Sequence, residues 1–232
     1  MLNLGLPTAI FDMDGTLIDS MPTWRSLNAS FLTRHNLSAP PSFVEELRQR
    51  SMHDSAQLLI EKFSLSLSVD EIIAENNRYM DQQYEVLREK PGASAYLKAL
   101  KAAGVRMVVA TYTPLPMALH ALRAHGMLDC FEWVTTPDIE GISKNDPAFF
   151  LALAQKLGQD PTQIIVYEDM PAVMCAAKAC GMKVAAISEF VWRERWAEAQ
   201  KMCDLAIEDY ARNWKWPHRH AHGRGGERGT LV

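Results

Sequence analysis

Short apolar segments alternate with helical patterns along most of this chain of 232 residues. The apolar segments are rich in branched aliphatic side chains and are closed by polar residues, which is typical of buried strands. They cover residues 8–11, 106–111, 163–167, 183–187 and 205–207. The helical segments between them have a proline near the start and a glycine just past the end, as helix boundaries often do. This order predicts an α/β fold with a parallel sheet covered by helices on both faces.

Residues 20–88 interrupt the alternation. They are rich in Leu, Gln, Glu, Asn and Ser, carry apolar residues at helical spacing, and contain no strand-like run. We expect a helical insertion there, acting as a cap over a site at the strand ends. The predicted organisation is therefore a catalytic core from residues 1–19 and 89–216, a helical cap from 20–88 and a flexible tail from 217–232. Three alternating histidines in the tail are not expected to form a metal site.

Composition and charge exclude several classes of protein. Hydrophobic residues make up 48% of the chain and charged residues 22%, as in ordinary globular proteins. A net charge of −4 gives no basic footprint for nucleic acid, and no apolar run approaches the roughly 20 residues that cross a membrane. The spacing of the four cysteines fits neither a disulfide framework nor a metal site, and no signal peptide is evident. We expect free thiols in a cytoplasmic protein.

Two carboxylates, Asp12 and Asp14, follow the first predicted strand directly, and Gly15 comes after them. A buried strand end is an expensive place for two like charges. A divalent cation and a reaction on phosphate would account for both, although such a segment alone is often only a turn.

Three further polar positions lie at predicted strand or loop ends. Thr111 follows one strand, Lys144 precedes a helix, and Glu168 with Asp169 follows another strand. Each alone has an ordinary structural explanation, such as a solvated lysine or a helix cap. Because sites in open parallel sheets form beyond the carboxyl ends of the strands, we expect all of them to meet there.

This set of groups matches phosphoryl transfer through an aspartyl-phosphate. Hydrolysis of phosphate monoesters is very slow without a catalyst, and a carboxylate nucleophile divides it into two displacements. Positive charge must bring the two anions together, and Mg²⁺ on oxygen ligands and Lys144 would supply it. Thr111 can donate a hydrogen bond to a phosphoryl oxygen. Asp14 is close enough in sequence to protonate the leaving oxygen and later deprotonate water.

The segment Phe11-Asp12-Met13-Asp14-Gly15-Thr16-Leu17-Ile18-Asp19-Ser20 resembles the first motif of the haloacid dehalogenase-like hydrolase superfamily. Glu168-Asp169 and residues 176–182 resemble the fourth motif region, and the resemblance covers residues from about 8 to 210. It implies a Rossmann-like core with an inserted helical cap, as in the subgroup of beta-phosphoglucomutase and phosphoglycolate-type phosphatases.

The resemblance also implies roles for individual residues. Asp12 would be the nucleophile and Asp14 the general acid/base. Mg²⁺ would be held by the Asp12 carboxylate, the Asp14 backbone carbonyl and Asp169, with Glu168 as a further ligand. Thr111 and Lys144 fit the second and third motifs as phosphate-binding residues. The chain departs from the usual pattern at Tyr112, Asn145-Asp146-Pro147, Met170 and Val173.

Within the superfamily, hydrolysis of a small phosphorylated metabolite is the favoured reaction. Dehalogenases do not retain the second aspartate, which is present here as Asp14. Phosphonate hydrolysis needs a cap lysine, and Lys62, which we expect on a solvent-facing helix, is the only lysine well inside the insertion. A sugar phosphomutase is the main alternative. The register of its histidine falls on Trp24 and that of its arginine on Met52, and both differences favour a hydrolase.

The cap is expected to select the substrate. Arg48, Arg50 and His53 are candidates for contacting the organic part of a phosphate ester, although an exposed helix would explain them equally well. Trp24 is expected to pack at the hinge between cap and core. A catalytically inactive phosphate-binding protein would lack at least one of the reacting groups, and none is missing. We expect a monomer or a dimer.

Overall fold

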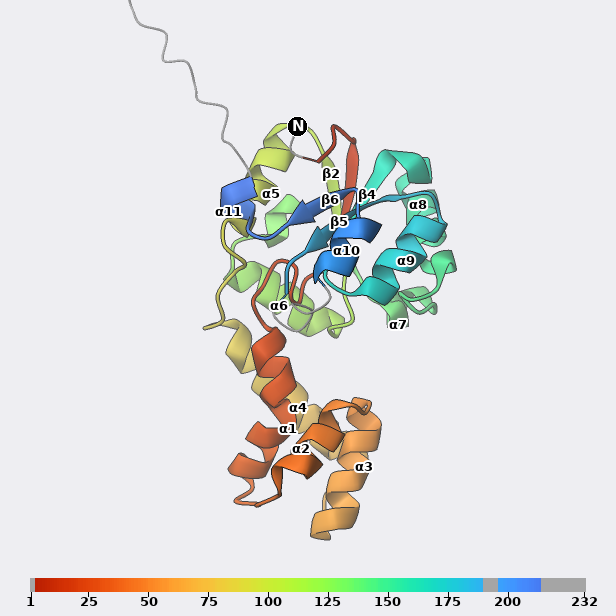
Figure 1. The fold of residues 1–232 in the computed structure, drawn as a ribbon. Coiled ribbons are helices and arrows are strands. Elements are labelled where there is room, and N and C mark those ends of the chain that lie inside the picture. The colour runs from red at the N-terminus through yellow and green to blue at the C-terminus, as the bar shows by residue number, and fades with distance from the viewer. Residues whose placement is uncertain (1–2, 190–195, 214–232) are drawn as a thin grey trace, which may run out of the picture.

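One parallel sheet forms the centre of the molecule (Figure 1). The computed structural model describes residues 3–189 and 196–213, so the predicted tail at 217–232 lies outside the described residues. Within them the strand order is β3-β2-β1-β4-β5-β6. The strands are β1 (Thr8–Phe11), β2 (Arg106–Ala110), β3 (Val134–Thr135), β4 (Ile164–Glu168), β5 (Lys183–Ile187) and β6 (Leu205–Ile207).

This order confirms the predicted parallel sheet and sets β1 between β2 and β4. The sequence pattern did not predict β3, because two residues are too few to show a periodicity. It also ended β4 at Tyr167, one residue before the observed end at Glu168.

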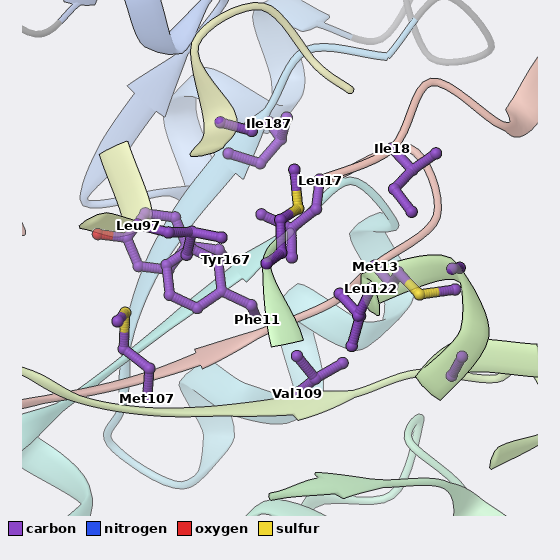
Figure 2. Close-up of a cluster of buried hydrophobic side chains, with 14 of the residues drawn as sticks. Phe11, Met13, Leu17, Ile18, Leu97, Met107, Val109, Leu122, Tyr167 and Ile187 are labelled. Atoms are coloured by element: carbon purple, nitrogen blue, oxygen red, sulfur yellow. The ribbon is translucent and has the colours of Figure 1, made fainter. Parts of the chain in front are cut away.

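Alternate residues of the strands supply two separate hydrophobic clusters, one on each face of the sheet. Phe11, Val109 and Tyr167 face helices α5 (Ala93–Ala102), α6 (Leu115–Ala124) and α11 (Tyr210–Asn213), as the close-up in Figure 2 shows for the first two helices. Ile10 and Val108 belong to the cluster on the opposite face, packed by α8 (Pro147–Leu157), α9 (Pro171–Ala179) and α10 (Trp196–Met202). Burial of both faces explains why the strands read as continuous apolar runs.

Local chemistry fixes the helix boundaries that the sequence predicted. In α8, the Asp146 side chain accepts a hydrogen bond from the Ala148 N–H at the start, and Gly158 ends the helix at φ +61°. A residue with a side chain would be strained in that left-handed conformation. The departure at Asn145-Asp146-Pro147 therefore supplies an ordinary helix cap.

The residues between β1 and β2 form the helical insertion. Its first four helices are α1 (Met21–Arg34), α2 (Pro41–Arg48), α3 (Met52–Phe63) and α4 (Val69–Tyr84). They have a hydrophobic cluster of their own, which includes Phe31, Leu59 and Ile72. Figure 1 shows these four helices standing off one end of the sheet, joined to it through the start of α1 and the end of α4. The exact domain boundaries stay a prediction.

Two further expectations concern the surroundings of the protein. All four cysteines are free thiols. Among the described residues, no helix combines the length and the hydropathy that a membrane span requires.

Candidate active site

The predicted strand-end residues meet at one edge of the sheet. Asp12 follows β1, Thr111 follows β2, and Glu168 ends β4 with Asp169 directly after it. Lys144 reaches the same place from the loop between α7 (Pro137–Glu140) and α8. Parallel pairing of β1 with both β2 and β4 produces this convergence, because it aligns the carboxyl ends of the three strands.

Lys144 is the buried cation of the site. Its Nζ lies 2.7 Å from Asp12 Oδ1 and 3.0 Å from Glu168 Oε2, and it donates to the Ala110 carbonyl oxygen at 2.8 Å. Burial disfavours the ammonium, but the charges of Asp12 and Glu168 outweigh burial, so the pKa of Lys144 is raised. Its side chain is only 1% exposed, which places it among the few lysines that proteins bury with a partner.

Three buried carboxylates form a cluster at this lysine, and two of them, Asp12 and Glu168, contact it. Oxygen atoms of Asp12, Glu168 and Asp169 lie within 4.8 Å of one another. Burial, together with the charge of Glu168, raises the pKa of both Asp12 and Asp169. When ionised, the three carboxylates and Lys144 have a net charge of −2, which one divalent cation would neutralise.

The donor set fits Mg²⁺, which prefers oxygen ligands. Asp169 Oδ2 is buried and has no hydrogen-bond partner among the described residues. A Cβ at Gly15 would come within 2.6 Å of that oxygen, and Gly15 has φ +78°. Glu168 is less available, because its Oε1 accepts hydrogen bonds from the backbone N–H groups of Asp169 and Met170. Asp12 and Asp169 are thus the carboxylates best placed to hold the ion.

Asp14 has a different environment from these carboxylates, because neutral donors surround it. Its Oδ1 accepts hydrogen bonds from Tyr84 at 2.6 Å, Ser20 at 2.5 Å and Trp24 Nε1 at 3.1 Å. Its Oδ2 accepts one from the Thr113 hydroxyl at 2.6 Å. Burial and the charge of Asp14 raise the pKa of Tyr84, so the phenol keeps its proton and stays a donor.

Sequence reasoning missed most of this arrangement. Trp24 was expected only to pack at the hinge, and Tyr84, Ser20 and Thr113 were not singled out. Tyr84 is 70 positions from Asp14 along the chain, at the end of α4, so no local spacing connects them. Ser20 carries the one local signal, since it lies within the motif segment itself.

Thr111 is buried beside the carboxylates, and its Oγ1 accepts a hydrogen bond from the Thr113 N–H. Tyr112, a departure from the family pattern, is 45% exposed, and its ring lies 5.4 Å from Lys144 Nζ. The departure therefore leaves the reacting groups in place.

The structure does not bring the predicted cap residues to this cluster. Arg50 donates to Glu46 at 2.7 Å and lines a separate cavity within the cap, and His53 is exposed beside Asp54. Arg48 pairs with Glu45. Lys62 is exposed, with its Nζ 4.5 Å from the Phe43 ring in the cap.

Comparisons with known proteins identify the family of this chain. The model of the haloacid dehalogenase-like hydrolases matches residues 6–181. The chain is 30% identical over 216 residues to the validoxylamine A 7'-phosphate phosphatase of Streptomyces hygroscopicus subsp. limoneus, covering 90% of this chain and 96% of the relative. It is 29% identical over 182 residues to hexitol phosphatase A of Escherichia coli, covering 77% and 82%.

Solved structures agree on the fold. The structure of CbbY from Rhodobacter sphaeroides in complex with phosphate has a TM-score of 0.72 and 20% identity, with 89% of this chain and 95% of that chain covered. The parallel sheet with its helical insertion is therefore a shared architecture. Together, the motif match over most of the chain and the relatives show that the chain belongs to the haloacid dehalogenase-like hydrolase family.

Proposed function

We propose that this protein is a Mg²⁺-dependent phosphatase that hydrolyses a small phosphorylated metabolite through an aspartyl-phosphate on Asp12. The contact between Asp12 Oδ1 and Lys144 Nζ at 2.7 Å, beside the unpartnered Asp169 Oδ2, carries this proposal. It supports the proposal because a carboxylate, a buried cation and a carboxylate oxygen without a hydrogen-bond partner among the described residues lie together there. The relatives named validoxylamine A 7'-phosphate phosphatase and hexitol phosphatase A support it.

In the first step, a carboxylate oxygen of Asp12 attacks phosphorus and the ester oxygen departs. Asp14 gives its proton to that oxygen, so the alcohol leaves neutral. In the second step, Asp14 takes a proton from water, whose oxygen attacks phosphorus and releases inorganic phosphate, restoring the Asp12 carboxylate. Lys144 and Thr111 stabilise the charge on the phosphoryl oxygens. Mg²⁺, held by Asp12 and Asp169, would supply further positive charge there.

Trp24 supports hydrolysis over the mutase alternative. In the sequence register, Trp24 falls where the mutases of the resemblance carry a histidine, and in the structure its Nε1–H is donated to Asp14 and to Tyr84. An indole N–H is only a donor, so Trp24 cannot remove a proton from a sugar hydroxyl. Water is then the acceptor of the phosphoryl group.

The direct test is release of inorganic phosphate from p-nitrophenyl phosphate with Mg²⁺ and with EDTA. We expect turnover only with Mg²⁺, and mass spectrometry of acid-quenched enzyme should find phosphate on the peptide that contains Asp12. If the folded protein released no phosphate above background, and Asp12→Asn left that background unchanged, the result would support a phosphate-binding protein instead.

A second assay separates phosphatase from mutase. Glucose 1-phosphate is supplied with a bisphosphate primer, and both glucose 6-phosphate and inorganic phosphate are measured. We expect phosphate release without isomerisation. Formation of glucose 6-phosphate without net phosphate release would reverse the choice.

A further inference from the structure

A cavity of about 400 Å³ lies between the cap and the core and contains both Asp12 and Asp14. Its floor is the acidic end of the sheet. Its remaining wall is formed largely by apolar side chains, contributed by both parts of the molecule: Met21, Trp24, Met52, Ile73, Pro114 and Met170. Among the described residues that line it, none is a lysine, arginine or histidine.

The cationic side chains of the cap lie elsewhere. Arg48 and Arg50 line the second cavity, which shares Trp24 and Met52 with the first, and both pair with glutamates of α2. Within the described part of the chain, a second carboxylate or phosphate on the substrate would therefore face mostly apolar side chains and no counter-charge from the cavity wall. Moving an unpaired anion into such surroundings is strongly unfavourable.

Asn77 is the polar exception on the cap side of the cavity. It lies on α4, and its Oδ1 is buried without a hydrogen-bond partner among the described residues. A buried acceptor of this kind costs free energy unless something donates to it. The neighbouring Asn76, by contrast, accepts from Arg34 at 2.9 Å within the cap.

We propose that this cavity selects phosphate esters of uncharged alcohols with an apolar face, and that Asn77 is a specificity-determining residue that accepts a hydrogen bond from the alcohol. The apolar face would pack on Trp24 and Ile73 while the phosphate lies at Asp12. This inference rests on the proposed phosphatase function and narrows its substrate class. In this inference, the substrate is selected because no cationic side chain among the described residues of the cap lines the cavity. The sequence had instead suggested that Arg50 and His53 contact the substrate.

The charge preference is tested with two substrates that differ by one carboxylate, ethyl phosphate and phosphoglycolate. We expect kcat/KM for phosphoglycolate to be at least about tenfold lower, and kcat/KM for benzyl phosphate to exceed both, because it offers an apolar face. Equal or better turnover of phosphoglycolate would overturn the inference while leaving the phosphatase function intact. No turnover of any ester, p-nitrophenyl phosphate included, would overturn both.

The role of Asn77 is tested with a second pair, para-hydroxymethylbenzyl phosphate and para-methylbenzyl phosphate. Wild type should prefer the hydroxymethyl ester by about tenfold, and Asn77→Leu should abolish that preference while still hydrolysing the methyl ester. An unchanged preference in Asn77→Leu would overturn the role of Asn77.

A charge placed at the same position should change selectivity in a defined direction. Asn77→Lys is expected to raise the ratio of kcat/KM for phosphoglycolate over ethyl phosphate by about tenfold. Gln82→Lys is the matched control, since Gln82 lies exposed on the same helix and outside the cavity. Equal changes in both variants would mean that net charge, and not the cavity, determines selectivity, and would overturn the inference.

Discussion

The two sides of the catalytic cavity differ in almost every physical property. On the core side, the ionisable side chains are buried: Asp12, Glu168 and Asp169 lie at the ends of strands, and Lys144 joins them from the loop before α8. On the cap side, Trp24 and Ile73 are uncharged and half-buried, on helices that have their own hydrophobic cluster. In the proposed function, the reaction takes place at the sheet, where side chains are accurately placed, whereas the separately packed cap would select the substrate.

The largest expected effect is on the core side and is specific to chemistry. Asp12→Asn removes the nucleophile but keeps the shape of the side chain, so kcat should fall by at least about 10³-fold. Phosphate release is the measurement, and far-UV circular dichroism should show an unchanged fold. Retained turnover would mean that phosphate is transferred directly to water.

Lys144→Met tests whether the core side depends on charge balance. Removing the ammonium leaves Asp12 and Glu168 buried without their counter-charge, which should cost about 3–5 kcal/mol of unfolding free energy. Urea unfolding measures this cost. Lys183→Met is the control, because that lysine is 48% exposed and its partner Asp204 keeps a second pair with Lys178, so its loss should cost less than about 1 kcal/mol. Similar costs for both would show that burial of Lys144 contributes nothing special.

Metal binding should stabilise the core side, because the ion neutralises the charge of the clustered carboxylates. Saturating Mg²⁺ is expected to add about 1–3 kcal/mol to the unfolding free energy, and EDTA should remove it. Asp169→Asn should abolish this response, yet be at least as stable as wild type without metal, because one of the clustered negative charges is gone. Thermal melts with and without Mg²⁺ measure both. A variant that still responds to Mg²⁺ would place the ion elsewhere.

Tyr84→Phe tests the shorter of the two hydrogen bonds by which Tyr84 and Trp24 of the cap reach Asp14. Loss of its hydrogen bond to Asp14 should weaken proton donation to the leaving group, lowering kcat/KM for alkyl phosphates by about tenfold. The loss for p-nitrophenyl phosphate should be smaller, since nitrophenolate leaves without a proton. Tyr79→Phe on the same helix is the control. Equal losses on both substrates would reduce Tyr84 to a structural role.

The smallest expected effect concerns the contact between α4 and α6. His120 Nδ1 lies 2.7 Å from Asp81 Oδ1, and this hydrogen bond raises the pKa of His120 above its ordinary value of 6.5. The pair therefore contributes its full stabilisation below pH 6.5 and loses it as the pH rises through the raised pKa. Titration followed by NMR should show a lower His120 pKa in Asp81→Asn. An unchanged pKa would mean that the pair does not form in solution.

The core side of the comparison could be predicted from the sequence because its signals are local. Asp12, Thr111 and Asp169 each follow a recognisable apolar run, and parallel pairing brings strand ends together without further information. The position of Lys144 could be predicted only because it comes shortly before the helix that begins at Pro147. Short β3 was missed because residues 134–135 show no periodicity.

The cap side could not be predicted in the same way. Contacts of Tyr84 with Asp14, and the position of Asn77 on the cavity wall, depend on how α1 and α4 pack against each other and on the core. Helical periodicity predicts which face of a helix is buried, but not which distant residue it meets. Charge alone suggested Arg50, which follows α2 and pairs with Glu46 of that helix.

Gly15 has a consequence for how this sequence can vary. Its hydrogen atom occupies space that even a methyl group cannot share with Asp169 Oδ2, and its backbone lies in a conformation that other residues rarely adopt. Any replacement would have to reshape the turn and displace a proposed metal ligand in the same event. The position is therefore closed to gradual substitution, although it takes no part in the reaction.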